Sequence, residues 1–152
     1  MNKLACGCPG ASVRTIEKKD SKEITSTESR PSELRQWPTQ LQLVPPTAPY
    51  LKNAHLLIAA DCAPFAYADF HRDFIKGRVL VNACPKLDDT SSYVDKLAAM
   101  ISQNDIQSVT VPIMEVPCCR GLAMMAEQAV KQSGKDVPVE VVIIGVDGER
   151  KG

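Results

Sequence analysis

The stretch 108-SVTVPIMEVPCCRGLAMMAEQAVKQSGKDVPVEVVIIG-145 contains an apolar run, a helix-like segment and a second apolar run, in that order. Residues 108–114 and 139–145 are rich in valine and isoleucine, which is typical of strands buried on both faces. Between them, residues 120–133 place apolar side chains at helical spacing, and Ser133-Gly134 is a common helix end. A strand, a helix and a strand in this order predict two parallel strands joined by a crossover helix.

The same alternation extends upstream. We predict strands at 55–60 and 78–83 and helices at 66–75 and 90–103. The predicted fold is therefore α/β, a three-layer sandwich with a mainly parallel sheet of four strands or slightly more. In residues 39–44 glutamine alternates with leucine, a period of two, so this segment is either an edge strand or a loop laid on the sheet.

The length and composition predict one folded domain. A chain of 152 residues with 44% hydrophobic content can bury one sizeable core. Residues 1–30 are mostly polar and offer too little apolar surface to offset the entropy of ordering them. We predict a flexible tail or linker over 1–30, carrying Cys6 and Cys8, and a single α/β domain over 31–152.

Charge and hydropathy exclude several classes of function. Eighteen basic and 18 acidic residues balance, so no basic excess favours nucleic acid or an anionic membrane surface. The N-terminus lacks an apolar signal region, and no run approaches the length of a transmembrane helix. We expect a cytoplasmic protein, where a reducing environment makes six cysteines more typical of metal or redox sites than of disulfides.

Four cysteines follow directly on predicted strands: Cys62, Cys84, Cys118 and Cys119. A single cysteine at a strand end is usually a small buried hydrophobic side chain. Thiols at three strand ends are different, because ligand sites of parallel α/β sheets lie outside the carboxyl ends of the strands. The vicinal pair also precedes a helix, whose N-terminus favours thiolate over thiol. These four residues are the candidate cofactor and metal ligands.

Thiolates bind both iron–sulfur clusters and zinc. Zinc is the weaker match, since structural zinc sites usually draw ligands in close C-x₂-C pairs. Iron–sulfur clusters take four cysteines, although the usual compact cysteine run is absent here. Adjacent Cys118 and Cys119 need a turn between them to face one centre. Cys6 and Cys8 form a second, less favoured pair on a turn rich in glycine and proline. The neighbours expected around the ligands are Asp61, His71 and Arg120.

Four stretches resemble a known family: 34-LRQWPTQLQLVPPTAPY-50, 58-IAADCAPFAYADFHRDFIKGRVLVNACPKLDD-89, 115-EVPCCRGL-122 and 140-EVVIIGVDG-148. They are similar to the C-terminal domain of 4Fe-4S ferredoxin-type iron–sulfur proteins of anaerobic bacteria and archaea. The resemblance covers residues 31–150. It implies an N-terminal dicluster ferredoxin module joined by a C-x-C-P-G linker. Only the linker element is present here, so we expect a truncated or split relative.

The resemblance implies a cytoplasmic iron–sulfur redox protein or an accessory domain in electron transfer, with a 4Fe-4S cluster. Its partner would be a redox protein such as a separately encoded ferredoxin. The vicinal cysteines also resemble the Cys-Cys-Gly elements of heterodisulfide-reductase-type subunits, but Arg120 stands at the expected glycine.

Two alternatives remain open. One is a thiol or persulfide enzyme with a reactive cysteine at a helix N-terminus, and the other is a docking domain for a ferredoxin subunit. No sequence motif for nucleotide binding or serine hydrolysis is present. The sequence leaves open whether the protein is an enzyme.

Overall fold

Four parallel strands form one sheet in the computed structural model, which describes residues 14–16 and 28–152. In chain order they are β1 (His55–Ala60), β2 (Val79–Ala83), β3 (Ser108–Met114) and β4 (Val139–Ile144). The order across the sheet is β2-β1-β3-β4. The predicted α/β fold with a parallel sheet is confirmed.

The central strand β1 is buried on both faces. Leu56, Leu57 and Ile58 are fully excluded from solvent, as expected for a strand with a neighbour on each side and a layer on each face. β1 pairs with β2 from Leu56 opposite Val79 to Ala60 opposite Ala83, and it also pairs with β3. The order reverses between β1 and β3, because the chain leaves β1 toward β2 and returns past β1 to β3.

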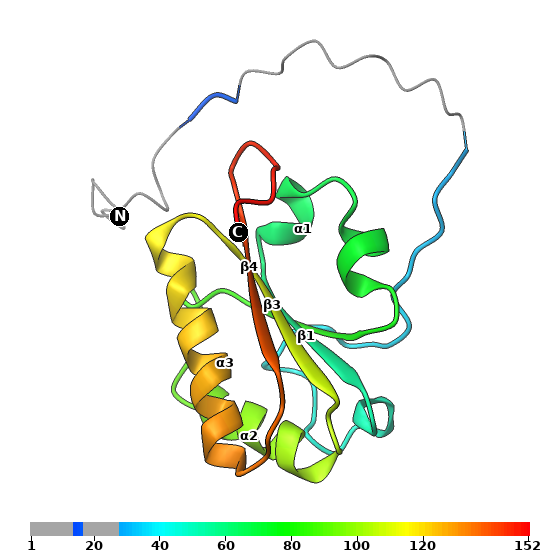
Figure 1. The fold of residues 1–152 in the computed structure, drawn as a ribbon, viewed down its shortest axis with the longest axis vertical. Coiled ribbons are helices and arrows are strands. Elements are labelled where there is room, and N and C mark those ends of the chain that lie inside the picture. Colours follow the sequence, from blue (N-terminus) through cyan, green and yellow to red (C-terminus); the bar gives the residue numbers. More distant parts are fainter. Residues whose placement is uncertain (1–13, 17–27) are drawn as a thin grey trace.

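Helical segments cover both faces of the sheet (Figure 1). α2 (Tyr93–Gln103) and α3 (Arg120–Ser133) pack against one another on one face. On the other face lie the short α1 (Ala63–Ala66) and the π-helix η3 (His71–Ile75). Together with the sheet, these elements make the three layers that the sequence predicts.

The segment between β1 and β2 is less regular than the single helix predicted at 66–75. α1 begins earlier, at Ala63, and ends at Ala66, before the chain resumes as η3. Phe70 and Phe74 are four residues apart, a helical spacing, and both lie on the buried face of this segment. Phe70 and Phe74 are buried and stacked with ring centroids 5.1 Å apart, while Tyr67 meets the edge of Phe74.

Residues 39–44 form a loop along the sheet and no continuous strand. One parallel bridge joins Gln40 to Asn82, and the chain then turns, with Val44 N–H donating to the Gln40 carbonyl. The turn buries Leu41 and Val44, three positions apart, and leaves Leu43 62% exposed. The period of two suggested that Leu41 and Leu43 share a face, and the turn separates them.

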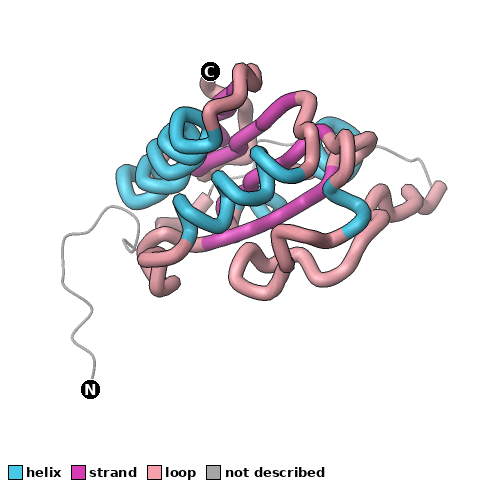
Figure 2. The backbone as a smooth tube through the Cα atoms, turned by 90° about the horizontal axis from the view of Figure 1, so that it is seen from below, coloured by secondary structure: helices cyan, strands magenta, loops and turns pink. Residues whose placement is uncertain are grey.

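Much of the remaining chain is loop (Figure 2). In the described part before β1, the one helical element is the 3₁₀ helix η2 (Pro49–Leu51). Near the start of this part, the Ser32 hydroxyl accepts a hydrogen bond from Leu34 N–H, and residues 31–35 form no helix. No helix among the described residues is both long and apolar enough to cross a membrane.

Candidate functional site at the carboxyl edge of the sheet

The pairing of β1 with β2 brings the first two strand-end cysteines together. The two strands stay in register up to Ala60 and Ala83, and Asp61 N–H then donates to the Ala83 carbonyl at 3.1 Å. Cys62 and Cys84 follow at once on these neighbouring strands, whose axes are about 4.8 Å apart. Cys62 is exposed and Cys84 is half-buried, and neither forms a disulfide.

The backbone at Cys84 is fixed by the carboxylate of Asp88. That carboxylate accepts hydrogen bonds from Cys84 N–H at 3.1 Å and from the Tyr93 hydroxyl at 2.7 Å. In return, Asp88 N–H donates to the Cys84 carbonyl at 2.9 Å. Burial, followed by the hydrogen bond to Asp88, raises the pKa of Tyr93 well above its ordinary value. The buried phenol thus remains a proton donor, and it anchors the cysteine loop to the start of α2.

The loop after β2 also reaches the start of α3. A Cβ added to Gly121 would lie 3.5 Å from Cβ of Pro85, so the two loops meet across the end of β1. On the other side of this edge, the C-terminal turn approaches α1. A Cβ on Gly148 would lie 2.7 Å from the carbonyl oxygen of Ala66. Three strand ends and the last turn therefore surround one region.

The vicinal cysteines lie in the turn that their adjacency requires. After β3 the chain forms the 3₁₀ helix η4 (Pro117–Cys119) and continues directly into α3. Cys118 is half-buried and Cys119 is buried, and their side chains are hydrogen-bonded to each other.

The expectation that the helix N-terminus stabilises a thiolate is wrong for Cys119. The pKa of this thiol is raised to about 11, chiefly by burial and also by the neighbouring thiols of Cys118 and Cys62, while a backbone hydrogen bond at Met114 lowers it. Burial destabilises the thiolate by more than the helix N-terminus and the hydrogen bond stabilise it. In the free protein Cys119 is therefore a thiol at neutral pH.

The strand-end thiols influence one another electrostatically. The pKa of Cys62 is raised first by desolvation, even though the residue as a whole is exposed, then by Cys84, Asp61 and Cys118. Thiols from all three strand ends thus interact at one edge of the sheet. The neighbouring Asp61 carboxylate accepts a hydrogen bond from the Asn82 side chain at 2.7 Å.

The donor chemistry at this edge suits a soft metal, but the ligands are not yet arranged around one. Within residues 14–16 and 28–152, no group of three or more histidine, cysteine, aspartate or glutamate side chains is placed to hold a metal ion. The other two candidate ligands, Cys6 and Cys8, lie outside the described residues. Arg14 does reach this edge, where it forms a 3.7 Å ion pair with Glu115, the first residue after β3.

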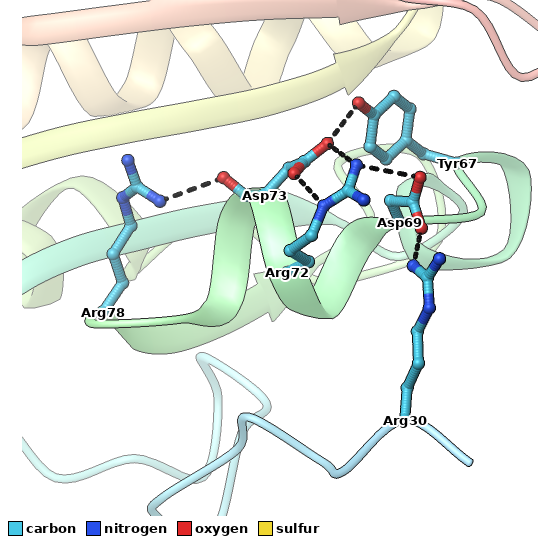
Figure 3. Close-up of polar contacts among 6 residues, drawn as sticks. All are labelled: Arg30, Tyr67, Asp69, Arg72, Asp73 and Arg78. Atoms are coloured by element: carbon cyan, nitrogen blue, oxygen red, sulfur yellow. Dashed lines mark hydrogen bonds and ion pairs between the residues drawn. The ribbon is translucent and has the colours of Figure 1, made fainter. Parts of the chain in front are cut away.

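His71 is held elsewhere, by the segment that precedes the sheet. Its Nδ1 accepts a hydrogen bond from Glu33 N–H at 3.1 Å. Around it, η3 carries a polar network (Figure 3), in which Arg72 pairs with both Asp69 and Asp73, and Arg30 pairs with Asp69. This network fastens the segment around Arg30 to η3. Among the described residues, no hydrogen bond links His71 to a cysteine. The expectation that His71 is a neighbour of the ligands is therefore not supported.

Two exposed apolar side chains beside the cysteines were missed by the sequence reasoning. Phe65 is 92% exposed and Leu87 is 82% exposed. Each lies three residues after a strand-end cysteine, in 62-CAPF-65 and 84-CPKL-87. This repeated Cys-x-x-apolar spacing is the signal that could have identified them.

Comparisons with known proteins address the fold more than the chemistry. Residues 48–150 match the model of a Rossmann-like domain family. An uncharacterized protein of Archaeoglobus fulgidus is 36% identical over 116 residues, which cover 76% of this chain and 81% of the archaeal protein. No solved structure matches the chain.

Proposed function

Because the chain belongs to a Rossmann-like domain family, we propose that its functional centre lies at the carboxyl edge of the sheet and is built from Cys62, Cys84, Cys118 and Cys119. Ligands of such folds bind outside the carboxyl ends of the strands, where the strand order reverses. Here that point lies between β1 and β3. Cys62 follows the first of these strands, and the vicinal pair follows the second.

The proposed activity is electron transfer by a 4Fe-4S cluster bound to these thiols. The observation that carries it is that four free cysteines follow three strands that end at the same edge of the sheet. Four thiolates are a common donor set of iron–sulfur clusters. The resemblance of residues 31–150 to the C-terminal domain of ferredoxin-type iron–sulfur proteins supports the same proposal. When bound, such a cluster supplies one-electron redox chemistry.

Different residues of this chain would have different roles in binding the cluster. The four sulfurs would be the ligands, and all must lose their protons to bind metal. This requirement is largest at Cys119, whose pKa is about 11 without metal. Since no three ligands are already in place among the described residues, the loops must draw together on binding. Asp88 and Tyr93 hold the Cys84 backbone while Cys62 remains exposed and free to adjust.

Anaerobic reconstitution with iron and sulfide tests the proposal. The expected result is a brown protein with bound iron and inorganic sulfide and a cluster EPR signal after reduction. Serine at Cys62 or at Cys84 should lower bound iron markedly. Serine at Cys6 or at Cys8 is the matched control and should leave it nearly unchanged. A folded protein that stays colourless and free of iron under these conditions contradicts the proposal.

A docking role for a separate ferredoxin is the second candidate. It is favoured by Phe65 and Leu87, two exposed apolar side chains that each lie three residues after a strand-end cysteine. In this case partner binding would depend on the apolar side chains and survive replacement of the four cysteines by serine. Phe65→Ser with Leu87→Ser would abolish co-purification with the ferredoxin. If the quadruple serine variant itself no longer binds, the cluster proposal is favoured.

A thiol enzyme has less support. The pKa values of Cys62 and Cys119 are both raised, whereas a nucleophilic cysteine needs a pKa lowered toward neutrality. A centre made of free thiols fits a reducing compartment such as the cytoplasm, and the proposed partner is another redox protein.

A further inference from the structure

A cleft lies at the opposite end of the sheet from the cysteines. Its volume is about 520 Å³, within the range typical of small-molecule sites. His55 and Val79 line it, and these are the first residues of β1 and β2. The cleft therefore opens at the amino ends of the two strands, away from the candidate cluster site.

The cleft is lined by positive charge without a matching carboxylate. Arg35, Lys76 and Arg78 line it, and no aspartate or glutamate does. Neither the Arg35 nor the Lys76 side chain has a hydrogen bond or ion pair with another residue of the described part. Arg78 donates from Nη1 to the carbonyls of Asp73 at 3.2 Å and Phe74 at 2.9 Å. These carbonyls hold the guanidinium in place and leave its charge without a counter-ion.

A buried hydroxyl in the same wall lacks a partner. Among the described residues, the Tyr50 hydroxyl oxygen is the one buried side-chain polar atom without a hydrogen bond. Tyr50 also lines the cleft. Burial raises its pKa, so the phenol stays protonated and can donate to an acceptor. Buried polar groups of native proteins are nearly always hydrogen-bonded, and a bound molecule is one way to satisfy the Tyr50 hydroxyl.

The backbone leaves room for a ligand at one side of the cleft. Gly77 has a φ of 76°, and no atom lies within 4 Å of the position that its Cβ would occupy. Glycine adopts this left-handed conformation without strain. A bound group can therefore approach the main chain between Lys76 and Arg78 closely.

We propose that this cleft binds a small organic molecule that carries two anionic groups, phosphate or carboxylate. Arg35 and Lys76 pair with the anionic groups, Arg78 adds a fixed positive charge, and the Tyr50 hydroxyl donates a hydrogen bond. Unpaired cations with no nearby carboxylate favour an anion, and the volume exceeds what a single inorganic phosphate needs. The proposal does not depend on the cysteine edge.

Titration of the full chain with pyrophosphate and, separately, with citrate tests this site. Isothermal titration calorimetry should show saturable binding of at least one probe, and the tighter probe assigns phosphate or carboxylate as the anionic group. The double variant Arg35→Gln, Lys76→Gln should weaken that binding by about tenfold or more, because each change removes a charge-assisted contact. Lys52→Gln is the matched control, since Lys52 is an exposed neighbour outside the cleft, and it should bind as the wild type does.

Tyr50→Phe provides a test that does not change charge. It removes a hydroxyl that has no partner in the free protein, so the thermal midpoint should stay or rise while probe binding weakens. Cys62→Ser should bind the probe as the wild type does, which separates this site from the cluster. The proposal is overturned if neither probe shows saturable binding, or if the folded double variant binds as tightly as Lys52→Gln.

Discussion

The Tyr93 hydroxyl donates a 2.7 Å hydrogen bond to the Asp88 carboxylate, which in turn holds the backbone N–H of Cys84. Tyr93 is the first residue of α2 and is 1% exposed. A core side chain therefore fixes the position of a half-buried strand-end cysteine. Because the link is made through one carboxylate, it can be broken without touching the cysteine itself.

Replacing Tyr93 by phenylalanine should loosen the Cys84 loop. The Asp88 carboxylate loses one donor, and hydrogen bonds to charged groups contribute about 1.5–3 kcal/mol, so the free energy of unfolding should fall by a similar amount. Urea unfolding measures the loss, and the alkylation rate of Cys84 should rise. Tyr67→Phe is the matched control, because it removes a tyrosine–aspartate bond on η3 and should leave Cys84 alkylation unchanged. An equal effect of both changes on Cys84 would contradict the anchoring role.

Cys119 should be the slowest cysteine to alkylate in the metal-free, reduced protein. Its pKa is raised to about 11, chiefly by burial, so the reactive thiolate remains a small fraction at pH 8. Alkylation across a pH series, read by mass spectrometry, should show its rate still climbing at pH 10. Rapid reaction of Cys119 that levels off below about pH 8.5, the ordinary range of a free thiol, would instead support the nucleophilic enzyme.

Asp73 should contribute stability that is lost only in acid. Hydrogen bonds from Arg72 and then from Tyr67 lower its pKa to about 2 from an ordinary 3.8. The unfolded chain therefore takes up this proton at higher pH than the folded chain does. The contribution is complete above about pH 4 and disappears as the pH falls toward 2. The urea midpoints of wild type and Asp73→Asn should differ at pH 7 and converge near pH 2, and a constant gap would mean that the pKa is not lowered.

Alanine at Gly148 should destabilise the fold more than alanine at Gly134. Both glycines are left-handed, with φ of 88° and 71°, so either change costs about 1–2 kcal/mol in backbone strain. At Gly134 no atom lies within 4 Å of the new Cβ, whereas at Gly148 it would meet the Ala66 carbonyl oxygen at 2.7 Å. Thermal and urea unfolding of the two variants measure the difference. Equal losses would show that the C-terminal turn does not pack against α1 as described.

The sequence was most informative where the signal is local. The Val- and Ile-rich runs placed β1 to β4 within a residue at each end, because a doubly buried strand needs a continuous apolar run. It was less informative between β1 and β2. There the buried Phe70 and Phe74 lie at helical spacing, but nothing in that spacing indicates that the segment is divided into α1 and η3. Residues 39–44 show the same limit. Leucines two positions apart are typical of a strand, but this segment forms a turn that buries Leu41 and Val44.

For the candidate site, the sequence determined that thiols follow three strands, and parallel pairing then required them to share one edge. The tertiary structure decided the rest. The order β2-β1-β3-β4 puts Cys62 between the other cysteines, and burial raises the pKa of Cys119 despite its helix N-terminus. The tertiary structure also leaves Phe65 exposed to solvent, and it brings Arg35 and Lys76 to the wall of one cleft. Strand order, desolvation and the joining of distant segments depend on contacts across the whole chain, whereas the spacing of side chains along it records only their immediate neighbours.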